Sequence, residues 1–148
     1  MKKSQGDKNE IPSNDHRVLG QALDLFSFHD VAPGAPFWHP KGMVVVKELE
    51  KYIRKIQDDN GYLEISTPIM AKQKLFEKSG HWQFYKDNMF KVEVDKETYV
   101  LKPMNCPGGA LVYSNTKRSY RDLPLRYAEI GRLHRNEISG VLGGLLSV

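Results

Sequence analysis

Apolar residues recur at the spacing of a helix in two parts of the chain. The stretch DHRVLGQALDLFSF carries a first apolar stripe, and Asp15 has a side chain suited to the N-cap of this helix. A longer pattern predicts a helix over residues 43–59, which Asn60 and Gly61 end. The apolar face of this helix consists of Val45, Leu49, Tyr52, Ile53 and Ile56. Both helices therefore have one face to bury.

Shorter apolar runs between turn-forming residues predict β-strands. The run YLEISTP predicts a strand over residues 62–67, because the ring of Pro68 cannot donate to a strand ladder. Residues 89–94 and 98–101 predict a hairpin with a turn at residues 95–97. Consecutive strands joined by a hairpin are typical of an antiparallel sheet.

The second half of the chain continues this mixture of elements. AKQKLFEKSG predicts a short helix, and GGALVYSN a further helix, with Asn105 as its cap and Pro107 in its first turn. Residues 118–137 predict two strands with a kink near Gly131, and ISGVLGGLLSV predicts a glycine-rich turn entering another strand. The loop VAPGAPFWHPKG is expected to be ordered, because Phe37 and Trp38 are costly to leave in water. The order of elements predicts an α+β fold, an antiparallel sheet flanked by helices.

Composition narrows the class of protein. The chain has 148 residues, a formal net charge of +4 and a pI near 9.1, which permits an anionic partner such as a nucleotide or RNA without requiring one. No apolar run approaches the roughly 18 residues of a membrane helix, so a cytoplasmic protein is expected. Residues 1–14 are polar and predict a flexible linker. No P-loop, GxGxxG, HExxH or nucleophile-elbow motif is present.

Cys106, in the stretch LKPMNCPGG, is the one cysteine of the chain. A lone cysteine is most often a small buried hydrophobe, but it can also be a nucleophile or a metal ligand. At the start of a predicted helix, a thiolate is favoured by the amide donors there, which suits zinc binding. An open zinc site needs three protein ligands, and none of the five histidines lies at a short Cys-x-x-His spacing. Sequence spacing therefore leaves these alternatives open.

Arg135 and Glu137 form a second candidate site, in the stretch LHRNE. Alternate side chains of a strand share a face, so these two side chains are expected to point the same way. Arginine can clamp a phosphate in a fork geometry, and a glutamate two residues along can accept a hydrogen bond from the amino group of a base. The alternative is a salt bridge between strands. The spacing permits a nucleotide site without selecting it.

Several stretches together resemble the threonyl-tRNA synthetases, in the same order and at the same spacings. They are DHRVLGQALDLFSF, APGAPFWHPKG, SGHWQFYKDNMF, LKPMNCPGG, SYRDLPLRYAEIG and HRNEISG. The resemblance runs from about Asp15 to Val148. It implies a class II catalytic domain that joins threonine to ATP, giving threonyl-adenylate, and then passes threonine to its tRNA.

The resemblance also implies particular roles. The helix 43–59, the strand YLEIST and Pro68 match the first class II motif, which builds a homodimer interface. LRYAEIGRLHRNE matches the second motif, in which Arg135 binds the α-phosphate of ATP, supplied with magnesium, as a catalytic residue, and Glu137 binds the adenine amino group. Cys106 matches a ligand of a zinc ion that holds threonine through its amino and hydroxyl groups, and Met104 lines the same pocket. A metal that requires a hydroxyl ligand rejects valine, which a hydrophobic pocket separates poorly from threonine.

The chain departs from the family pattern in several places. The family usually has histidine in place of Gly109 and commonly arginine near Ser147. By resemblance, two histidine zinc ligands and the third class II motif lie beyond Val148. Residues 15–148 are therefore expected to form an incomplete catalytic domain, a fragment that does not form threonyl-adenylate alone.

Two other functions are considered. The chain could be a synthetase-like module that dimerises without catalysis, a hypothesis that the departures at Gly109 and Ser147 favour. A class II synthetase for proline or serine is disfavoured by Cys106 within PMNCPG.

Overall fold

Helix α1 (His16–Ala22) begins where the sequence predicts, because the carboxylate of Asp15 accepts a hydrogen bond of 2.9 Å from the backbone N–H of Arg17.

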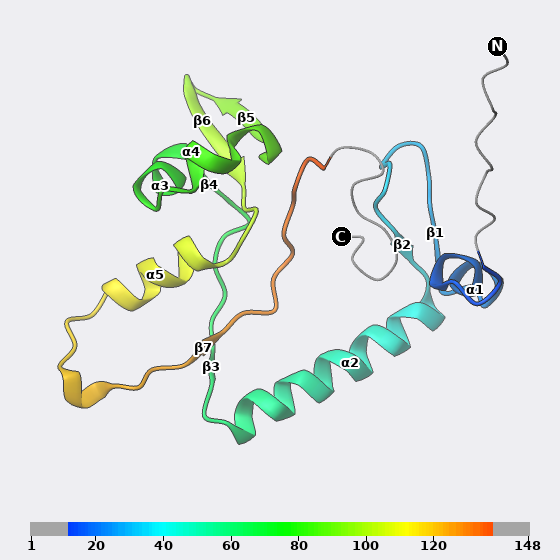
Figure 1. The fold of residues 1–148 in the computed structure, drawn as a ribbon, viewed down its shortest axis with the longest axis horizontal. Helices are drawn as coiled ribbons and strands as arrows, with labels where there is room; N and C mark the ends of the chain where they lie inside the picture. Colours follow the sequence, from blue (N-terminus) through cyan, green and yellow to red (C-terminus); the bar gives the residue numbers. More distant parts are fainter. Residues whose placement is uncertain (1–11, 138–148) are drawn as a thin grey trace, which may run out of the picture. The chain divides into compact units, whose positions relative to one another are not determined.

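The computed structural model describes residues 12–137, which divide into two units, residues 12–49 and residues 50–137 (Figure 1). Each unit has a short pairing of strands of its own. The predicted turn and strand in ISGVLGGLLSV, and Ser147 with it, lie outside the described residues.

The first unit contains a two-stranded antiparallel pair. Strand β1 (Phe26–Ser27) pairs with β2 (Phe37–Trp38). Phe37 and Trp38 therefore form a strand where the sequence predicts a loop. The ring of Phe26 is buried and meets the ring of Trp38 edge to face, at 5.5 Å between centroids. This aromatic contact across the pair accounts for the extended backbone at residues 37 and 38.

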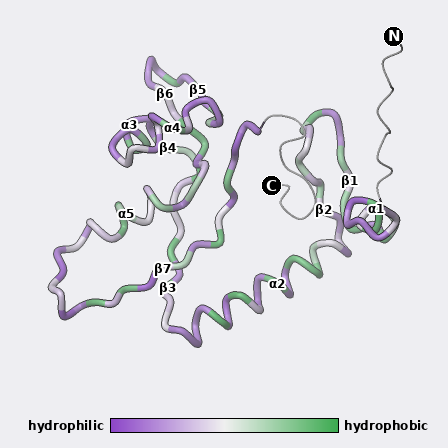
Figure 2. The backbone as a smooth tube through the Cα atoms, viewed as in Figure 1, coloured by the Kyte–Doolittle hydropathy of each residue, from purple (hydrophilic) through white to green (hydrophobic). Residues whose placement is uncertain are grey.

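Helix α2 (Pro40–Asp59) is the longest element and begins three residues earlier than predicted. Proline suits the first turn of a helix, where its missing N–H costs no hydrogen bond. The helix ends as predicted, with Gly61 at φ +69. Figure 2 shows hydrophobic segments alternating with hydrophilic ones along α2. Its apolar face is exposed, with exposed fractions from 38% to 66%, at Val45, Leu49, Tyr52, Ile53 and Ile56.

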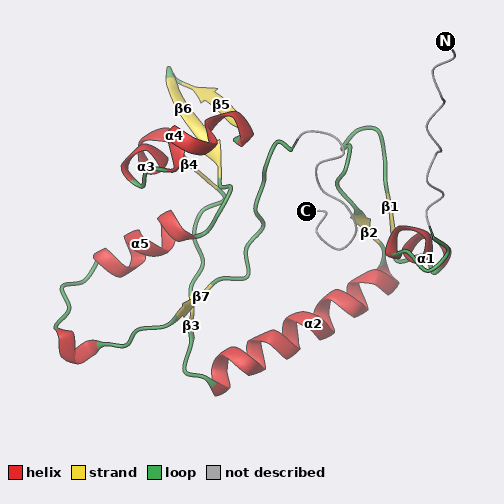
Figure 3. Cartoon of the chain, viewed as in Figure 1, coloured by secondary structure: helices red, strands yellow, loops and turns green. Residues whose placement is uncertain are grey.

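The second unit holds a three-stranded antiparallel sheet (Figure 3). Its strands β4 (Met70–Lys72), β6 (Glu97–Leu101) and β5 (Lys91–Val94) lie in that order across the sheet. The hairpin between β5 and β6 confirms the prediction, with a turn at Asp95 and Lys96, whose φ angles are 50 and 66. The short helix α3 (Gln73–Lys78) confirms another prediction.

A small core lies between this sheet and the helices that follow β4. Phe76 of α3, Met89 and Val100 of β6 are almost fully buried, with 1%, 4% and 0% of each residue exposed. The other elements here are α4 (His81–Tyr85) and the 3₁₀ turn η1 (Lys86–Asn88). Antiparallel strands with helices packed on them confirm the predicted α+β class.

Two short strands form a parallel pair, which the sequence analysis did not predict. β3 (Leu63–Glu64) is shorter than the predicted strand 62–67 and pairs with β7 (Tyr127–Ala128). The second strand predicted within residues 118–137 is wrong: after β7, residues 129–137 are in neither helix nor strand. The backbone N–H groups of His134 and Asn136 donate to the carbonyls of Lys102 and Asn88 instead of building a ladder.

The remaining elements lie between β6 and β7. Helix α5 (Cys106–Ser114) follows β6, and the 3₁₀ turn η2 (Tyr120–Asp122) follows α5. None of the helices within residues 12–137 combines the length and the apolar character that a membrane span needs.

Candidate functional site

Arg135 is held in place by the loop between β6 and α5. Its Nε donates a hydrogen bond of 3.1 Å to the carbonyl oxygen of Pro103. Within the described part of the chain, no other hydrogen bond or ion pair involves this guanidinium. The two terminal nitrogens therefore remain for a ligand, while the Nε contact fixes the plane of the group.

Glu137 lines the same cavity as Arg135. The cavity has a volume of about 330 Å³, and its lining consists of Tyr85, Asn88, Pro103, Met104, Arg135 and Glu137. The sequence analysis expected Arg135 and Glu137 to share a face of a strand, and the backbone there is not a strand. A tight turn joins them instead, in which the N–H of Glu137 donates to the carbonyl of Arg135 at 3.1 Å.

Cys106 is exposed and is the first residue of α5, two residues after Met104. Asn105 takes the N-cap position, but its side chain does not cap the helix as expected. Its Nδ2 instead donates to the carbonyl of Glu129 at 3.3 Å. Within residues 12–137, no three His, Cys, Asp or Glu side chains are grouped as metal ligands. The zinc site therefore stays a prediction resting on Cys106.

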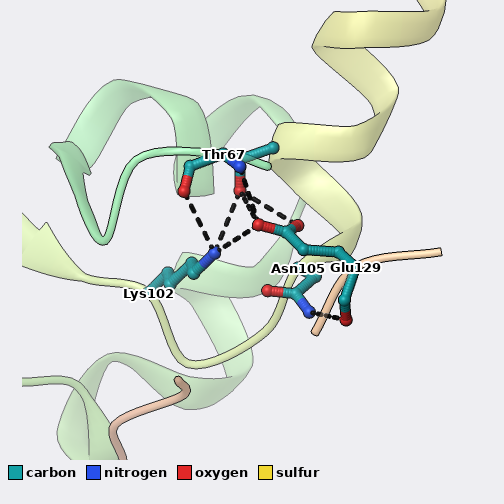
Figure 4. A network of polar contacts seen from close by, with 4 residues as sticks. All are labelled: Thr67, Lys102, Asn105 and Glu129. Atoms are coloured by element: carbon teal, nitrogen blue, oxygen red, sulfur yellow. Dashed lines mark hydrogen bonds and ion pairs between the residues drawn. The ribbon is translucent and has the colours of Figure 1, made fainter. Parts of the chain in front are cut away.

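A buried polar network lies beside this site (Figure 4). The Nζ of Lys102 donates to Glu129 Oε1 at 2.7 Å, to Thr67 Oγ1 at 3.1 Å and to the Thr67 carbonyl at 3.3 Å. The Glu129 carboxylate also accepts from the backbone N–H of Thr67 at 2.7 Å. The side chains of Lys102 and Glu129 are only 5% and 6% exposed. All three protons of the ammonium group therefore have acceptors inside the protein.

The carboxylate of Glu129 is ionised in this environment. Burial by itself would raise the pKa of Glu129, but the hydrogen bonds from Lys102 and Thr67 outweigh it, and the pKa is lowered overall. The pair therefore stabilises the fold above the pKa of the unfolded carboxyl, and this contribution is lost as the pH falls. The sequence analysis missed this pair, although a lysine and a glutamate within apolar stretches were a signal of it.

Gly108 lets helix α5 approach the network closely. A Cβ at this position would lie 2.8 Å from Thr67 Oγ1, which is closer than real contacts allow. A Cβ at the neighbouring Gly109 would meet only Ile65 Cδ1, at an ordinary 3.7 Å. A smaller, apolar cavity of about 190 Å³ lies in the same region, between Thr67, Met104 and Leu111 among others.

A second polar cluster lies in the first unit. Its side chains contact one another in the order serine, histidine, aspartate, which is the order of a nucleophile, a base and an acid. Ser27 Oγ lies 2.9 Å from Nε2 of both His29 and His39, and His39 Nδ1 lies 2.7 Å from Asp24 Oδ1. The hydrogen bond from His39 lowers the pKa of Asp24. The imidazoles of two histidines share the hydroxyl of Ser27. The Asp24 side chain is 60% exposed, so water screens the charge of its carboxylate. We interpret this cluster as a link between β1 and the start of α2.

Comparisons with known proteins find similarity to class II tRNA synthetases. A family model described as tRNA synthetase class II core domain (G, H, P, S and T) matches residues 90–148. The chain is 55% identical, over 139 residues and 94% of its length, to the threonine–tRNA ligase of Caldanaerobacter subterraneus. It spans 22% of the length of that relative.

Solved structures of tRNA synthetases also resemble this chain. A structure described as the RNA binding domain of threonyl-tRNA synthetase from Cryptosporidium parvum matches with a TM-score of 0.85 and 44% identity, covering 90% of this chain and 34% of that one. Prolyl-tRNA synthetase from Giardia lamblia matches with a TM-score of 0.75 and 21% identity, covering 84% of this chain and 26% of that one. The latter likeness shows a shared fold only.

Proposed function

We propose a function from the family to which this chain belongs, the threonyl-tRNA synthetases, of which it spans one segment. The chain is part of an enzyme that joins threonine to its tRNA through threonyl-adenylate, with ATP and magnesium, in the cytoplasm. Its own contribution is the nucleotide-facing half of the activation site. The observation that carries this proposal is that Met104, Arg135 and Glu137 line one cavity together.

Arg135 is the proposed catalytic residue. When the threonine carboxylate attacks the α-phosphorus of ATP, negative charge builds on the phosphate oxygens as pyrophosphate leaves. A guanidinium already fixed through its Nε contact to Pro103 can stabilise this charge with its terminal nitrogens, without first reorienting. Glu137, in the same cavity, accepts a hydrogen bond from the adenine amino group and so orients the nucleotide.

Cys106 is the proposed zinc ligand on the amino-acid side. Its thiol is exposed at the first residue of α5, where a metal ion can reach it, and cysteine is a common zinc ligand, so the residue fits this role. Zinc would bind the amino and hydroxyl groups of threonine and so select it against valine. Met104 lies in the loop that holds Arg135 and lines the cavity of Arg135 and Glu137, which supports an amino-acid side next to the nucleotide side.

A chimera tests the proposal, since the chain spans 22% of the length of its relative. In it, this chain replaces the matching segment of the Caldanaerobacter subterraneus threonine–tRNA ligase. We expect threonine-dependent exchange of pyrophosphate into ATP by the chimera and none by the 148-residue chain alone. Exchange by the isolated chain, or a folded chimera without exchange, would contradict the proposal.

The alternative function is a module that dimerises without catalysis, and the exposed apolar face of α2 is the observation that favours it. A homodimer is also part of the proposed enzyme, so dimerisation alone does not decide between the two. A folded but inactive chimera that still dimerises would favour the module.

The apolar face of α2 gives a prediction of its own. Replacing Leu49, which is 64% exposed, by serine is expected to weaken self-association at least about tenfold, because apolar burial is lost. Lys51→Ser, off the apolar face of the same helix, should leave it unchanged. Sedimentation equilibrium measures both. Equal effects of the two substitutions would show that this face is not the dimer interface.

A further inference from the structure

We propose that Lys102 and Glu129 are positioning residues, which hold the segment carrying Met104 and Cys106 in register with the segment carrying Arg135. This inference rests on the proposed function for the meaning of the site. The placement of the pair itself stands on contacts within the second unit. Neither side chain lines the cavity of Arg135 and Glu137, so the pair acts through the backbone.

The network joins three segments that are distant in the sequence. Thr67 follows β3, Lys102 follows β6, and Glu129 follows β7. Thr67 offers its backbone N–H, its hydroxyl and its carbonyl to the pair, so both its main chain and its side chain are held. The side chains of Lys102 and Glu129 thus fix where the ends of these strands lie relative to one another.

The backbone next to Lys102 then places Arg135. The carbonyl of Lys102 accepts from the N–H of His134 at 3.0 Å, and the carbonyl of Pro103 accepts from Arg135 Nε at 3.1 Å. Any displacement of residues 102 and 103 therefore moves the guanidinium. Met104, two residues after the buried lysine, lines the same cavity as Arg135.

Close packing around the pair leaves little room for adjustment. A Cβ on Gly131 would lie 3.0 Å from both Lys102 Nζ and Asn105 Oδ1, so the chain passes directly over the ammonium group. Asn105 Oδ1 is buried and has no hydrogen-bond partner within the described residues, while Nδ2 of the same amide holds the Glu129 carbonyl. The amide is oriented by the register of the two segments, at the cost of leaving its acceptor oxygen without a partner among the described residues.

A buried ion pair is seldom needed for the stability of a fold. Variants of this pair can therefore distinguish a role in positioning the loop from a role in stabilising the protein. Replacing both partners by apolar residues is often neutral for stability, whereas removing one leaves an uncompensated charge. The double variant Lys102→Met/Glu129→Leu is therefore expected to unfold near the temperature of the original chain. The two apolar side chains cannot form hydrogen bonds with Thr67. The loop is therefore no longer held at one position relative to the segment that carries Arg135.

Amide hydrogen exchange on the full 148-residue chain tests the proposal. In the double variant, we expect the amides of His134 and Asn136 to exchange at least about tenfold faster, while those of the β5–β6 hairpin stay unchanged. Thr67→Val, which removes only the hydroxyl, should give a smaller acceleration at the same amides. Lys72→Met, which breaks the exposed pair with Glu97, serves as the control and should change neither.

Unchanged protection of His134 and Asn136 in a folded double variant would overturn the proposal. Faster exchange spread equally over the hairpin would also overturn it, because it would show a general stabilising role. If the double variant does not fold, Thr67→Val decides by the same criterion. The exchange needs no nucleotide, so this result is independent of the chimera assay, in which the double variant should raise the KM for ATP at least about tenfold.

Discussion

Replacing Arg135 by glutamine in the chimera is expected to lower kcat/KM for ATP by about 100- to 1000-fold in pyrophosphate exchange. Glutamine keeps a hydrogen-bonding group near Pro103 but removes the charge and the fork of terminal nitrogens. Those nitrogens have no partner within residues 12–137, so they can meet a phosphate, whereas the Nε is occupied by the Pro103 carbonyl. The loss should appear in kcat as well as in KM, since charge on the phosphate grows in the transition state.

Arg132→Gln is the matched control for this prediction. Arg132 lies on the same segment, and its side chain is outside the cavity lining that includes Arg135 and Glu137. This substitution should change kcat/KM by less than about threefold, the size of a general charge effect near a surface. A similar loss in both variants would mean that net charge, and not the placement of Arg135, supports the reaction.

Gly108→Ala is expected to lower the free energy of unfolding by about 1–3 kcal/mol, the usual effect of overpacking. The added methyl group would lie 2.8 Å from Thr67 Oγ1 and 2.9 Å from the neighbouring Thr67 carbons. Helix α5 must then move away from Thr67, or Thr67 must leave its bonds to Lys102 and Glu129. Thermal unfolding measures the effect, at about 2–4 °C for each kcal/mol in a chain of this size.

Gly109→Ala is the control, and it should behave in the opposite way. Its Cβ would meet Ile65 at 3.7 Å, an ordinary contact, and alanine is favoured over glycine in a helix by about 1 kcal/mol. Equal melting temperatures for the two alanine variants would contradict the close approach of α5 to Thr67.

Local patterns in the sequence predicted the local elements well. The N-cap at Asp15, the end of α2 at Gly61 and the β5–β6 hairpin each depend on residues close together in the chain. Helix spacing and turn residues encode such elements directly. Boundaries were less accurate, and α2 begins at Pro40 because proline fits a first helical turn.

Contacts between distant segments were not predictable in the same way. The parallel pairing of Leu63 with Tyr127 and the ion pair of Lys102 with Glu129 each join segments that no periodicity connects. Asn105 looked like a helix cap because its position is right, yet its amide reaches the Glu129 carbonyl instead. Tertiary contacts overrode the local preference in each of these cases.

Arg135 and Glu137 line one cavity, but the reason for which the sequence analysis expected them to lie together proved wrong. The sequence analysis placed Arg135 and Glu137 side by side through the alternation of a strand, but a tight turn joins them. The resemblance to a family supplied their roles, because spacing alone could not separate a nucleotide site from a salt bridge. The residues that hold Arg135 in place, Pro103 and Lys102, could be found only from the structure.

A crystal structure of the chimera with a stable analogue of threonyl-adenylate is the most direct measurement of the central claim. We predict that a terminal nitrogen of Arg135 lies about 2.7–2.9 Å from an oxygen of the α-phosphate, as in charge-assisted hydrogen bonds. The carboxylate of Glu137 should accept from the adenine amino group, with the Arg135 Nε still bonded to the Pro103 carbonyl. An analogue bound away from these side chains, with Arg135 turned out of the cavity, would contradict the account.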